Sequence, residues 1–273
     1  GDKNVLTSKE DLTSYARDAT EDLVYYPEIV VKTRTSQEIS QVLKLANDQR
    51  VPVTPRGGGT GLSGGALPVF GGICLSLERM NSILEIDRDN LMAVVEPGVI
   101  TENLQNEVEK LGLYYPPDPA SRGSCMIGGN VAENAGGPHA LKYGVTKDYV
   151  LGLEAILPNG QTIKTGGKLL KDVTGYNLTQ LLVGSEGTLA VVTKIVLKLI
   201  PLPPHRRLLY APFPTLRDAA QALTQIFANR IIPAACEFME KSSMDIVENR
   251  LGRRFPARGN AEACLLVELD GHN

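Results

Sequence analysis

The feature that most constrains this chain is a run of eleven residues from Pro55 to Gly65, six of which are glycine. Because glycine lacks a Cβ atom, several backbone N–H groups can converge on one anion without steric hindrance. Arg56 adds a cation, and Thr60 and Ser63 add two hydroxyl donors. The glycines alone would also fit a flexible surface loop or a glycine-rich turn. The interleaved arginine and hydroxyls instead favour a loop that binds a pyrophosphate.

The same run contains the GxGxxG spacing of dinucleotide-binding folds at Gly59, Gly61 and Gly64. That motif requires a preceding strand and a long helix that begins at the third glycine. Here Pro68 and a pair of glycines follow almost at once, and an apolar run over residues 73–77 comes next. No helix fits between them, so we reject a Rossmann fold and keep the phosphate-binding loop.

Two further stretches of small residues are candidates for the same ligand. Residues 116–137 contain prolines near their start, two glycine pairs and the amides Asn130 and Asn134, against which a flat ring system could lie. Residues 184–192 place small residues just before a strand-like run. Taken alone, the first stretch could equally be an ordered loop with structural turns, and the second an ordinary turn.

Short apolar runs predict the strands of the first two hundred residues. They lie at residues 29–31, 51–54, 73–77, 92–96, 150–157, 161–164 and within 188–199. The dipeptide Asn159-Gly160 separates two of these strands and is a strong hairpin signal.

Two amphipathic helices are predicted between these strands. The first begins at Thr35, with Glu38 as its capping-box partner, and its apolar face comprises Ile39, Val42, Leu43 and Ala46. The second begins with Thr101 as its cap and ends at Gly112.

Three closely spaced prolines at positions 201, 203 and 204 indicate a domain boundary. Beyond them we predict strands at 208–211, around Cys236 and at 264–269, and helices at 215–229 and 239–251. We therefore expect one domain over residues 1–203 and a second over 204–273. Because the chain stops directly after a predicted strand, we expect the second domain to continue beyond it.

The composition argues against several classes of function. A net charge of −3 and an isoelectric point of about 5.7 give no basic face for nucleic acid. No apolar stretch is long enough to cross a membrane, and the N-terminus lacks a signal-peptide core, so we expect a cytoplasmic protein, peripheral to a membrane only through partners. The four cysteines match no disulfide or zinc framework, and with only three histidines we expect no metal site in this chain.

Together the three loops resemble one family. The segments PRGGGTGLSGG, PPDPAS, IGGN with NAGG, and GSEGTLA are similar to those of the vanillyl-alcohol oxidase/PCMH-type FAD-linked oxidases, in particular the group that contains D-lactate dehydrogenase and the related glycolate oxidase subunit. The resemblance covers residues from about 28 to 200. It implies a PCMH-type FAD-binding domain of two α+β subdomains, followed here by the start of an α+β cap domain.

The resemblance also implies which residues bind FAD. Those expected to hold the pyrophosphate are Arg56, Gly57, Gly58, Gly59, Thr60, Gly61, Ser63 and Gly64. Those expected around the isoalloxazine and ribityl groups are Pro117, Asp118, Ser121, Ser124, Gly128, Gly129, Asn130 and Asn134. Gly187 and Val192 are expected near the adenine end or its supporting strand. Some relatives attach the flavin through a histidine of the first loop; Thr60 stands in that neighbourhood, so we expect non-covalent FAD.

The implied activity is oxidation of a small 2-hydroxy acid, of the glycolate or D-lactate type, to the 2-oxo acid by hydride transfer to flavin N5. An unidentified electron acceptor is then required, and partner subunits remain open. Two alternatives stay open as well: a non-catalytic FAD-binding subunit of an oxidoreductase complex, and a sugar or alcohol oxidase on the same fold. No catalytic base is nominated; His139, Tyr143 and Cys125 each have an ordinary structural role as an alternative to a place beside the flavin.

Overall fold

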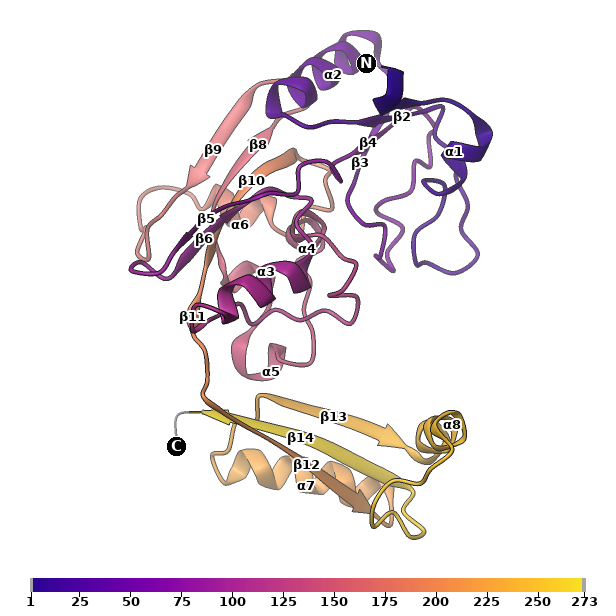
Figure 1. Ribbon diagram of the computed structural model, residues 1–273, viewed down its shortest axis with the longest axis vertical. Coiled ribbons are helices and arrows are strands. Elements are labelled where there is room, and N and C mark those ends of the chain that lie inside the picture. Colours follow the sequence, from indigo (N-terminus) through magenta and orange to yellow (C-terminus); the bar gives the residue numbers. More distant parts are fainter. Residues whose placement is uncertain (1, 272–273) are drawn as a thin grey trace. The chain divides into compact units, whose positions relative to one another are not determined.

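The computed structural model describes residues 2–271, so His272 lies outside the described residues (Figure 1). The chain folds into two compact units. The first comprises residues 2–135 and 145–202, and the second comprises residues 136–144 and 203–271. The chain therefore passes into the second unit once for a short excursion and again for its C-terminal part. The domain boundary expected after residue 203 stays a prediction.

The first sheet of the first unit carries the glycine loop on its edge strand. Its strand order is β1 (Val5–Leu6), β2 (Ile29–Lys32), β4 (Ile73–Ser76) and β3 (Val53–Arg56). The pairs β2–β4 and β3–β4 are parallel, whereas β1 pairs antiparallel with β2. Pro55 is accommodated within β3 because an edge strand has one side free of ladder hydrogen bonds. No helix lies between β3 and β4, which confirms the argument against a Rossmann fold.

Helix α2 (Ser36–Gln49) crosses between β2 and β3 and covers this sheet. It begins as predicted, because the Thr35 side chain accepts a hydrogen bond from the N–H of Glu38 at 3.2 Å. The Glu38 carboxylate accepts from the N–H of Arg34, one position before the cap. The predicted apolar face is confirmed, with Ile39, Leu43 and Ala46 buried. A shorter helix, α1 (Lys9–Thr13), precedes β2 and was not predicted.

The second sheet of the first unit is antiparallel. Its strand order is β5 (Ile83–Asp87), β6 (Met92–Val95), β10 (Val191–Lys198), β8 (Val150–Ile156) and β9 (Thr162–Gly166). Strands β8 and β9 pair across the predicted hairpin, where Gly160 has a φ of 80°. Alternate residues of β10 are buried, as expected for a strand with one face on the core.

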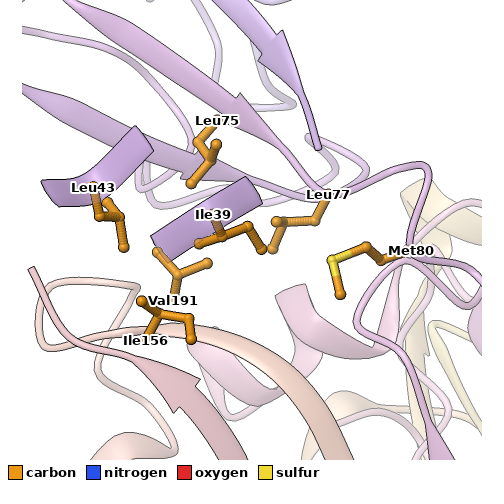
Figure 2. Packing of buried hydrophobic residues seen from close by; sticks show 7 residues of the cluster. All are labelled: Ile39, Leu43, Leu75, Leu77, Met80, Ile156 and Val191. Carbon is orange, nitrogen blue, oxygen red and sulfur yellow. The ribbon is translucent and has the colours of Figure 1, made fainter. Parts of the chain in front are cut away.

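One hydrophobic cluster joins the two sheets (Figure 2). Figure 2 shows the side chains of α2 and β4 pointing toward those of β8 and β10; the buried members are Ile39, Leu43, Leu75, Leu77, Met80, Ile156 and Val191. Leu77 and Val191 also line the large cavity of this unit. The packing that holds the two sheets together therefore forms part of the wall of the cavity.

The remaining elements of the first unit surround the second candidate loop. They are α3 (Thr101–Glu109), β7 (Leu113–Tyr114), α4 (Ile127–Glu133), the 3₁₀ turn Thr146–Asp148, α6 (Leu178–Leu182) and β11 (Ile200–Pro201), which pairs with β7. Thr101 is not the cap that we predicted: it is the first helical residue, and Ile100 precedes it without a side-chain cap. The first N–H groups of α3 donate instead to the carbonyl oxygens of Cys125 and Arg122.

Helix α4 is a second difference from the sequence prediction, which assigned only loop to residues 116–144. Its N-terminal N–H groups, from Ile127 and Gly128, donate to the carbonyl oxygens of Val99 and Pro97 at 2.9 and 2.7 Å. It ends at Asn134, which adopts a left-handed conformation with a φ of 50°. The helix thus depends on contacts with a distant strand end, which local sequence patterns do not reveal.

The second unit is built on a three-stranded antiparallel sheet in the order β12 (His205–Phe213), β14 (Ala263–Gly271) and β13 (Ala235–Glu240). Helix α7 (Leu216–Ala228) packs on it through Ala219, which is buried against Ala263, Leu265 and Val267. Helix α8 (Lys241–Leu251) follows β13 directly. The short helix α5 (Ala140–Tyr143) belongs to this unit, where Lys142 and Tyr143 bind the carboxylate of Asp270.

Candidate functional site

A cavity of about 570 Å³ lies in the first unit, between the three candidate loops. This volume is within the range of small-molecule and cofactor sites. Its walls are formed by residues 55–62 with 65 and 66, by 119–121 with 125–135 in part, and by 182–192 in part, together with Ala19, Leu77 and Pro97. Three segments that are distant in sequence therefore meet around one space, as expected from the sequence.

The glycine loop follows β3 and exposes its backbone to this space. Within residues 2–271, the N–H groups of residues 57–65 donate to no protein acceptor. Backbone N–H groups are almost always paired in folded proteins, by protein, water or a ligand. A run of unpaired donors along the wall of a cavity is what an anion-binding loop requires.

Two glycines of the loop are required by the fold itself. A Cβ on Gly58 would lie 2.6 Å from the carbonyl oxygen of Ser124, so the first and second loops could not approach as they do. Gly59 has a φ of +64°, and a Cβ there would overlap the guanidinium of Arg56. These glycines serve the close approach of neighbouring backbone and side chains, in addition to leaving room for a ligand.

Gly129 provides an independent test of whether the cavity is built for a ligand. It lines the cavity in the first turn of α4, and a Cβ added to it would meet no atom within 4 Å. Glycine in a helix costs up to about 1 kcal/mol relative to alanine. Nothing in the packing requires it, so its missing side chain has the effect of keeping the cavity open.

The Arg56 side chain is directed at the protein. It is 7% exposed and donates to the carbonyl oxygens of Ala66, Ser14 and Arg17, the last at 2.6 Å. Its guanidinium also lies over the ring of Tyr15, 5.7 Å from the ring centre. The cation that the sequence offered for phosphate binding is therefore committed to holding the N-terminal segment against the loop. The Arg56 backbone pairs with strand β4, where its carbonyl oxygen accepts from the N–H of Leu77 at 3.0 Å.

A carboxylate, Glu133, stands opposite the glycine loop. Both of its oxygens accept from the Ser63 hydroxyl at 3.0 Å, so this hydroxyl is also engaged by the protein. Burial raises the pKa of Glu133, and the neighbouring carboxylates of Glu186 and Asp18 raise it further, against the lowering effect of Ser63. Glu133 and Glu186 both line the cavity. The sequence reasoning missed them, because it searched the loops for donors only.

A buried polar network lies behind the second loop. The amide nitrogen of Asn130 donates to the Thr101 hydroxyl at 2.7 Å, and that hydroxyl lies 3.2 Å from the sulfur of Cys125. Asn130 and Cys125 both line the cavity, which gives Cys125 a place in the wall in addition to its packing role. One turn along α3, Gln105 donates to the carbonyl oxygens of Tyr115 and Pro117.

The third loop is attached to α4 by its backbone. The N–H groups of Gly184 and Glu186 donate to the carbonyl oxygens of Val131 and Ala132, both at 2.9 Å. Gly187 has a φ of 74°, a conformation that favours glycine. The loop leads into β10, so Gly187 and Val192 both reach the cavity wall.

Twelve of the eighteen residues proposed from the sequence line the cavity: Arg56, Gly57, Gly58, Gly59, Thr60, Gly61, Ser121, Gly128, Gly129, Asn130, Gly187 and Val192. The other six lie behind or beside the wall: Ser63, Gly64, Pro117, Asp118, Ser124 and Asn134. Several support it, since the Pro117 carbonyl binds Gln105 and the Asn134 side chain accepts from the N–H of Lys147 at 2.9 Å. The binding roles of all eighteen stay predictions.

Two further candidates belong to the second unit. His139 lies 3.3 Å from the carboxylate of Glu268, and the Tyr143 hydroxyl donates to Asp270 at 2.6 Å. The rings of His139 and Tyr143 meet edge to face. Within the described residues, no three side chains of His, Cys, Asp or Glu are grouped as metal ligands.

Comparison with known families bears directly on this cavity. The model of the FAD binding domain family matches residues 27–166, which include the glycine loop and helix α4. The chain belongs to this family. FAD is accordingly its cofactor, and the unpaired N–H groups of residues 57–65 together with the open space at Gly129 fit a dinucleotide that carries a pyrophosphate. Residues 202–273 match the model of the FAD linked oxidases, C-terminal domain.

Known proteins resemble the chain over nearly its whole length. It is 47% identical to the glycolate oxidase subunit GlcD of Bacillus subtilis over 99% of this chain and 57% of that protein. It is 46% identical to a D-lactate dehydrogenase of Archaeoglobus fulgidus over 89% of this chain and 54% of that protein. The chain thus spans little more than half the length of these relatives.

The fold also matches solved structures. An alkyldihydroxyacetonephosphate synthase superposes with a TM-score of 0.85 at 23% identity, over 98% of this chain and 53% of the other. p-Cresol methylhydroxylase superposes with a TM-score of 0.80 at 20% identity, over 99% of this chain and 58% of the other. These likenesses confirm the α+β, PCMH-type fold expected from the sequence. Over residues 2–271, no helix has both the length and the apolar character needed to traverse a lipid bilayer.

Proposed function

We propose that this chain is the FAD-binding part of an oxidoreductase that converts a small 2-hydroxy acid, of the glycolate or D-lactate type, to the 2-oxo acid. The names of its relatives support this assignment, since they include a glycolate oxidase subunit and D-lactate dehydrogenases. FAD would supply the chemistry by accepting the hydride from the α-carbon of the acid. The hydroxyl proton must pass to a base, and we assign that role to no residue of this chain.

The observation that carries the proposal is the row of N–H groups over residues 57–65 that donate to no acceptor within residues 2–271. They lie along a cavity whose first two loops fall within the FAD binding domain match over residues 27–166. In this proposal, the backbone of residues 57–61 holds the pyrophosphate. Residues of the second loop, with Asn130 and Gly129 at the wall, hold the ribityl and ring portions. Gly187 and Val192 lie toward the adenine end.

We further propose that FAD is bound without a covalent link. Among residues 2–271, those that line the cavity include no histidine, and Thr60 occupies the part of the first loop where some relatives carry one. Precipitation of the protein with acid should therefore release all of the flavin into the supernatant. Flavin that stays with the pellet would show a covalent attachment and refute this part of the proposal.

The second candidate function is a FAD-binding subunit that does not itself turn over substrate. The name of the Bacillus subtilis relative, a glycolate oxidase subunit, favours this candidate. It also suggests partner subunits for this chain. An external electron acceptor is required in either case. The proposed domain organisation, with residues 1–203 binding FAD and residues 204–273 beginning a substrate-covering domain, serves both candidates.

An anaerobic titration separates the two candidates. The purified protein, loaded with FAD, is mixed with D-lactate, L-lactate, glycolate, a sugar or a simple alcohol in the absence of oxygen, and the visible absorbance of oxidised flavin is followed. Bleaching by D-lactate or glycolate, and not by L-lactate, the sugar or the alcohol, supports the 2-hydroxy-acid assignment. Bound flavin that none of these compounds bleaches supports the subunit alternative, and bleaching by the sugar or the alcohol alone points to a different oxidase on this fold.

A further inference from the structure

We propose that Thr101 is a positioning residue of the FAD site, whose buried hydroxyl orients the Asn130 side chain so that its amide oxygen faces the cavity as a hydrogen-bond acceptor. The proposal rests on FAD occupying the cavity, as argued above. It concerns a residue of α3 that does not line the cavity itself.

Burial of the Thr101 hydroxyl is costly in free energy unless the hydroxyl is hydrogen-bonded. Its exposure is 0%, and those of Asn130 and Cys125 are 3% and 4%. A hydroxyl or amide in such surroundings costs on the order of 1–3 kcal/mol unless its hydrogen bonds are made. The Thr101 hydroxyl joins the other two side chains, since it accepts from the Asn130 amide nitrogen and lies 3.2 Å from the Cys125 sulfur, which fixes their relative positions.

The hydrogen bonds of the Thr101 hydroxyl have defined directions. A threonine hydroxyl has one proton to donate and two lone pairs. Its oxygen lies 3.4 Å from the carbonyl oxygen and 3.2 Å from the sulfur of Cys125, and it accepts from the amide nitrogen of Asn130 at 2.7 Å. The nitrogen end of the Asn130 amide is thus bound on the helix side.

The opposite end of the Asn130 amide is its oxygen. Within residues 2–271 the Asn130 amide oxygen accepts no hydrogen bond, and it is not among the buried atoms left without a partner. Asn130 lines the cavity, so its oxygen is available there. A fixed acceptor selects a ligand group that carries a proton, such as a flavin ring N–H or a ribityl hydroxyl, over one that carries only lone pairs.

Helix α3 is itself held against the second loop by hydrogen bonds. The N–H groups of Thr101 and Glu102 donate to the carbonyl oxygens of Cys125 and Arg122 at 3.1 and 3.0 Å. Gln105 holds the start of the same loop through its amide nitrogen. Thr101 therefore acts on Asn130 from a fixed base, as positioning of a binding group requires.

The experiment compares Thr101→Val with Thr101→Ser, Asn130→Ala and the Thr101→Val/Asn130→Ala double variant. Valine preserves the volume of threonine and removes only the hydroxyl, whereas serine keeps the hydroxyl. Thr165→Val is the matched control, because it deletes a buried hydroxyl of the same unit, bonded to Thr179 at 2.8 Å, that does not line the cavity. Each FAD-free protein is titrated with FAD, and the dissociation constant is measured from flavin fluorescence; thermal unfolding of the FAD-free proteins is measured in parallel.

We expect Thr101→Val to weaken FAD binding about tenfold, the value of one hydrogen bond, and Thr101→Ser to restore it to within about threefold of the wild type. Thr165→Val should lower the melting temperature without changing FAD affinity. Because Thr101 acts through Asn130, the double variant should bind no more weakly than Asn130→Ala alone.

Additive losses in the double variant, or FAD binding by Thr101→Val as tight as by Thr165→Val, would overturn the role of Thr101 and leave the FAD site intact. A wild-type protein that takes up no FAD would overturn the proposed function together with this inference. The two failures are therefore distinguishable in one series of titrations.

Discussion

The guanidinium of Arg56 donates a 2.6 Å hydrogen bond to the carbonyl oxygen of Arg17, so the residue directly before the first glycine of the loop is bound to a segment nearly forty positions earlier in the chain. The same guanidinium reaches the carbonyl oxygens of Ser14 and Ala66. The start of the loop is therefore held by a buried cation whose hydrogen-bond acceptors are all backbone oxygens.

Arg56→Met should consequently lower stability as well as FAD binding. Three carbonyl oxygens would lose a charged donor, and we expect a loss of about 2–4 kcal/mol in the free energy of unfolding. Urea unfolding of the FAD-free protein measures it. Arg17→Ala is the control, because Arg17 contributes its carbonyl oxygen, which the substitution retains. Equal stability of the Met variant and the wild type would contradict the structural role of Arg56.

Gly59 and Gly129 should respond in opposite ways to alanine. Gly59→Ala places a methyl group into the Arg56 guanidinium at a positive φ, so it should destabilise the protein by about 2 kcal/mol or more. Gly129→Ala meets open space within a helix and should stabilise the FAD-free protein by about 0.5–1 kcal/mol.

The Gly59→Ala and Gly129→Ala variants also separate an effect on the fold from an effect on FAD binding. The added methyl of Gly129→Ala points into the space that FAD is proposed to fill, so FAD affinity should fall at least about tenfold, by a clash of the order of 1–3 kcal/mol. Chemical denaturation and FAD titration of each variant test this. Undiminished FAD binding by Gly129→Ala would show that the wall around this residue is not in contact with the cofactor.

Glu133 should make FAD binding dependent on pH. Burial, with the charges of Glu186 and Asp18, raises the pKa of Glu133, and its negative form repels a pyrophosphate held by the opposite loop. Lowering the pH through that raised pKa should therefore tighten FAD binding. Glu133→Gln, which keeps an acceptor for Ser63, should bind FAD severalfold more tightly at pH 8 and lose the pH dependence, by removal of a like-charge contact of the order of 1 kcal/mol.

Titrations with FAD at several pH values, from the ordinary glutamate pKa of 4.5 upward past neutral, measure this effect. Glu109→Gln on α3 is the control, because that residue does not line the cavity. A Glu133→Gln variant with unchanged affinity at high pH would place the phosphates away from this carboxylate.

Glu78 should make the fold sensitive to acid. Burial acts to raise its pKa, but hydrogen bonds from Lys32, Tyr15 and Ser76, at 2.8, 3.0 and 3.1 Å, outweigh burial and lower it. Folding favours the charged form of the Glu78 carboxylate. Its contribution to stability is therefore present above the ordinary pKa of 4.5 and is lost as the pH falls through the lowered pKa.

Glu78→Gln should therefore reduce stability at pH 7 by about 1 kcal/mol and flatten the loss of stability in acid. Guanidinium unfolding at several pH values from neutral into the acid range measures both effects. Ser76→Ala, which leaves the lysine and tyrosine partners of Glu78 in place, should retain most of the acid dependence. An unchanged acid slope in the glutamine variant would assign the dependence to other carboxylates.

The parts of the fold that follow local rules could be predicted from the sequence. Thr35 begins a helix because its side chain caps the N–H of Glu38, and Asn159-Gly160 forms a hairpin because glycine there adopts a positive φ. Helix α4 could not be predicted in this way. Gly128 and Gly129 disfavour a helix, and the carbonyl oxygens of distant residues satisfy its first N–H groups.

The candidate site, like the fold, could be predicted only in part. Backbone donors and missing side chains are visible in a sequence, so the glycine loop was identified. Which side chains remain available for a ligand depends on tertiary neighbours: Arg56 and Ser63 were expected to face a pyrophosphate, and the fold gives them protein acceptors instead. Glu133 and Thr101 were missed because their roles arise only where α3, α4 and the first loop meet.

The short excursion of residues 136–144 has a consequence for how this protein can be divided. These residues belong to the second unit, where Lys142 and Tyr143 bind Asp270 on strand β14, although the FAD binding domain match runs straight across them. A single cut near residue 202 would therefore separate neither unit cleanly. Separation of the two units by limited proteolysis would require breaks in the backbone at three places, because each unit is made of two separate segments of the chain.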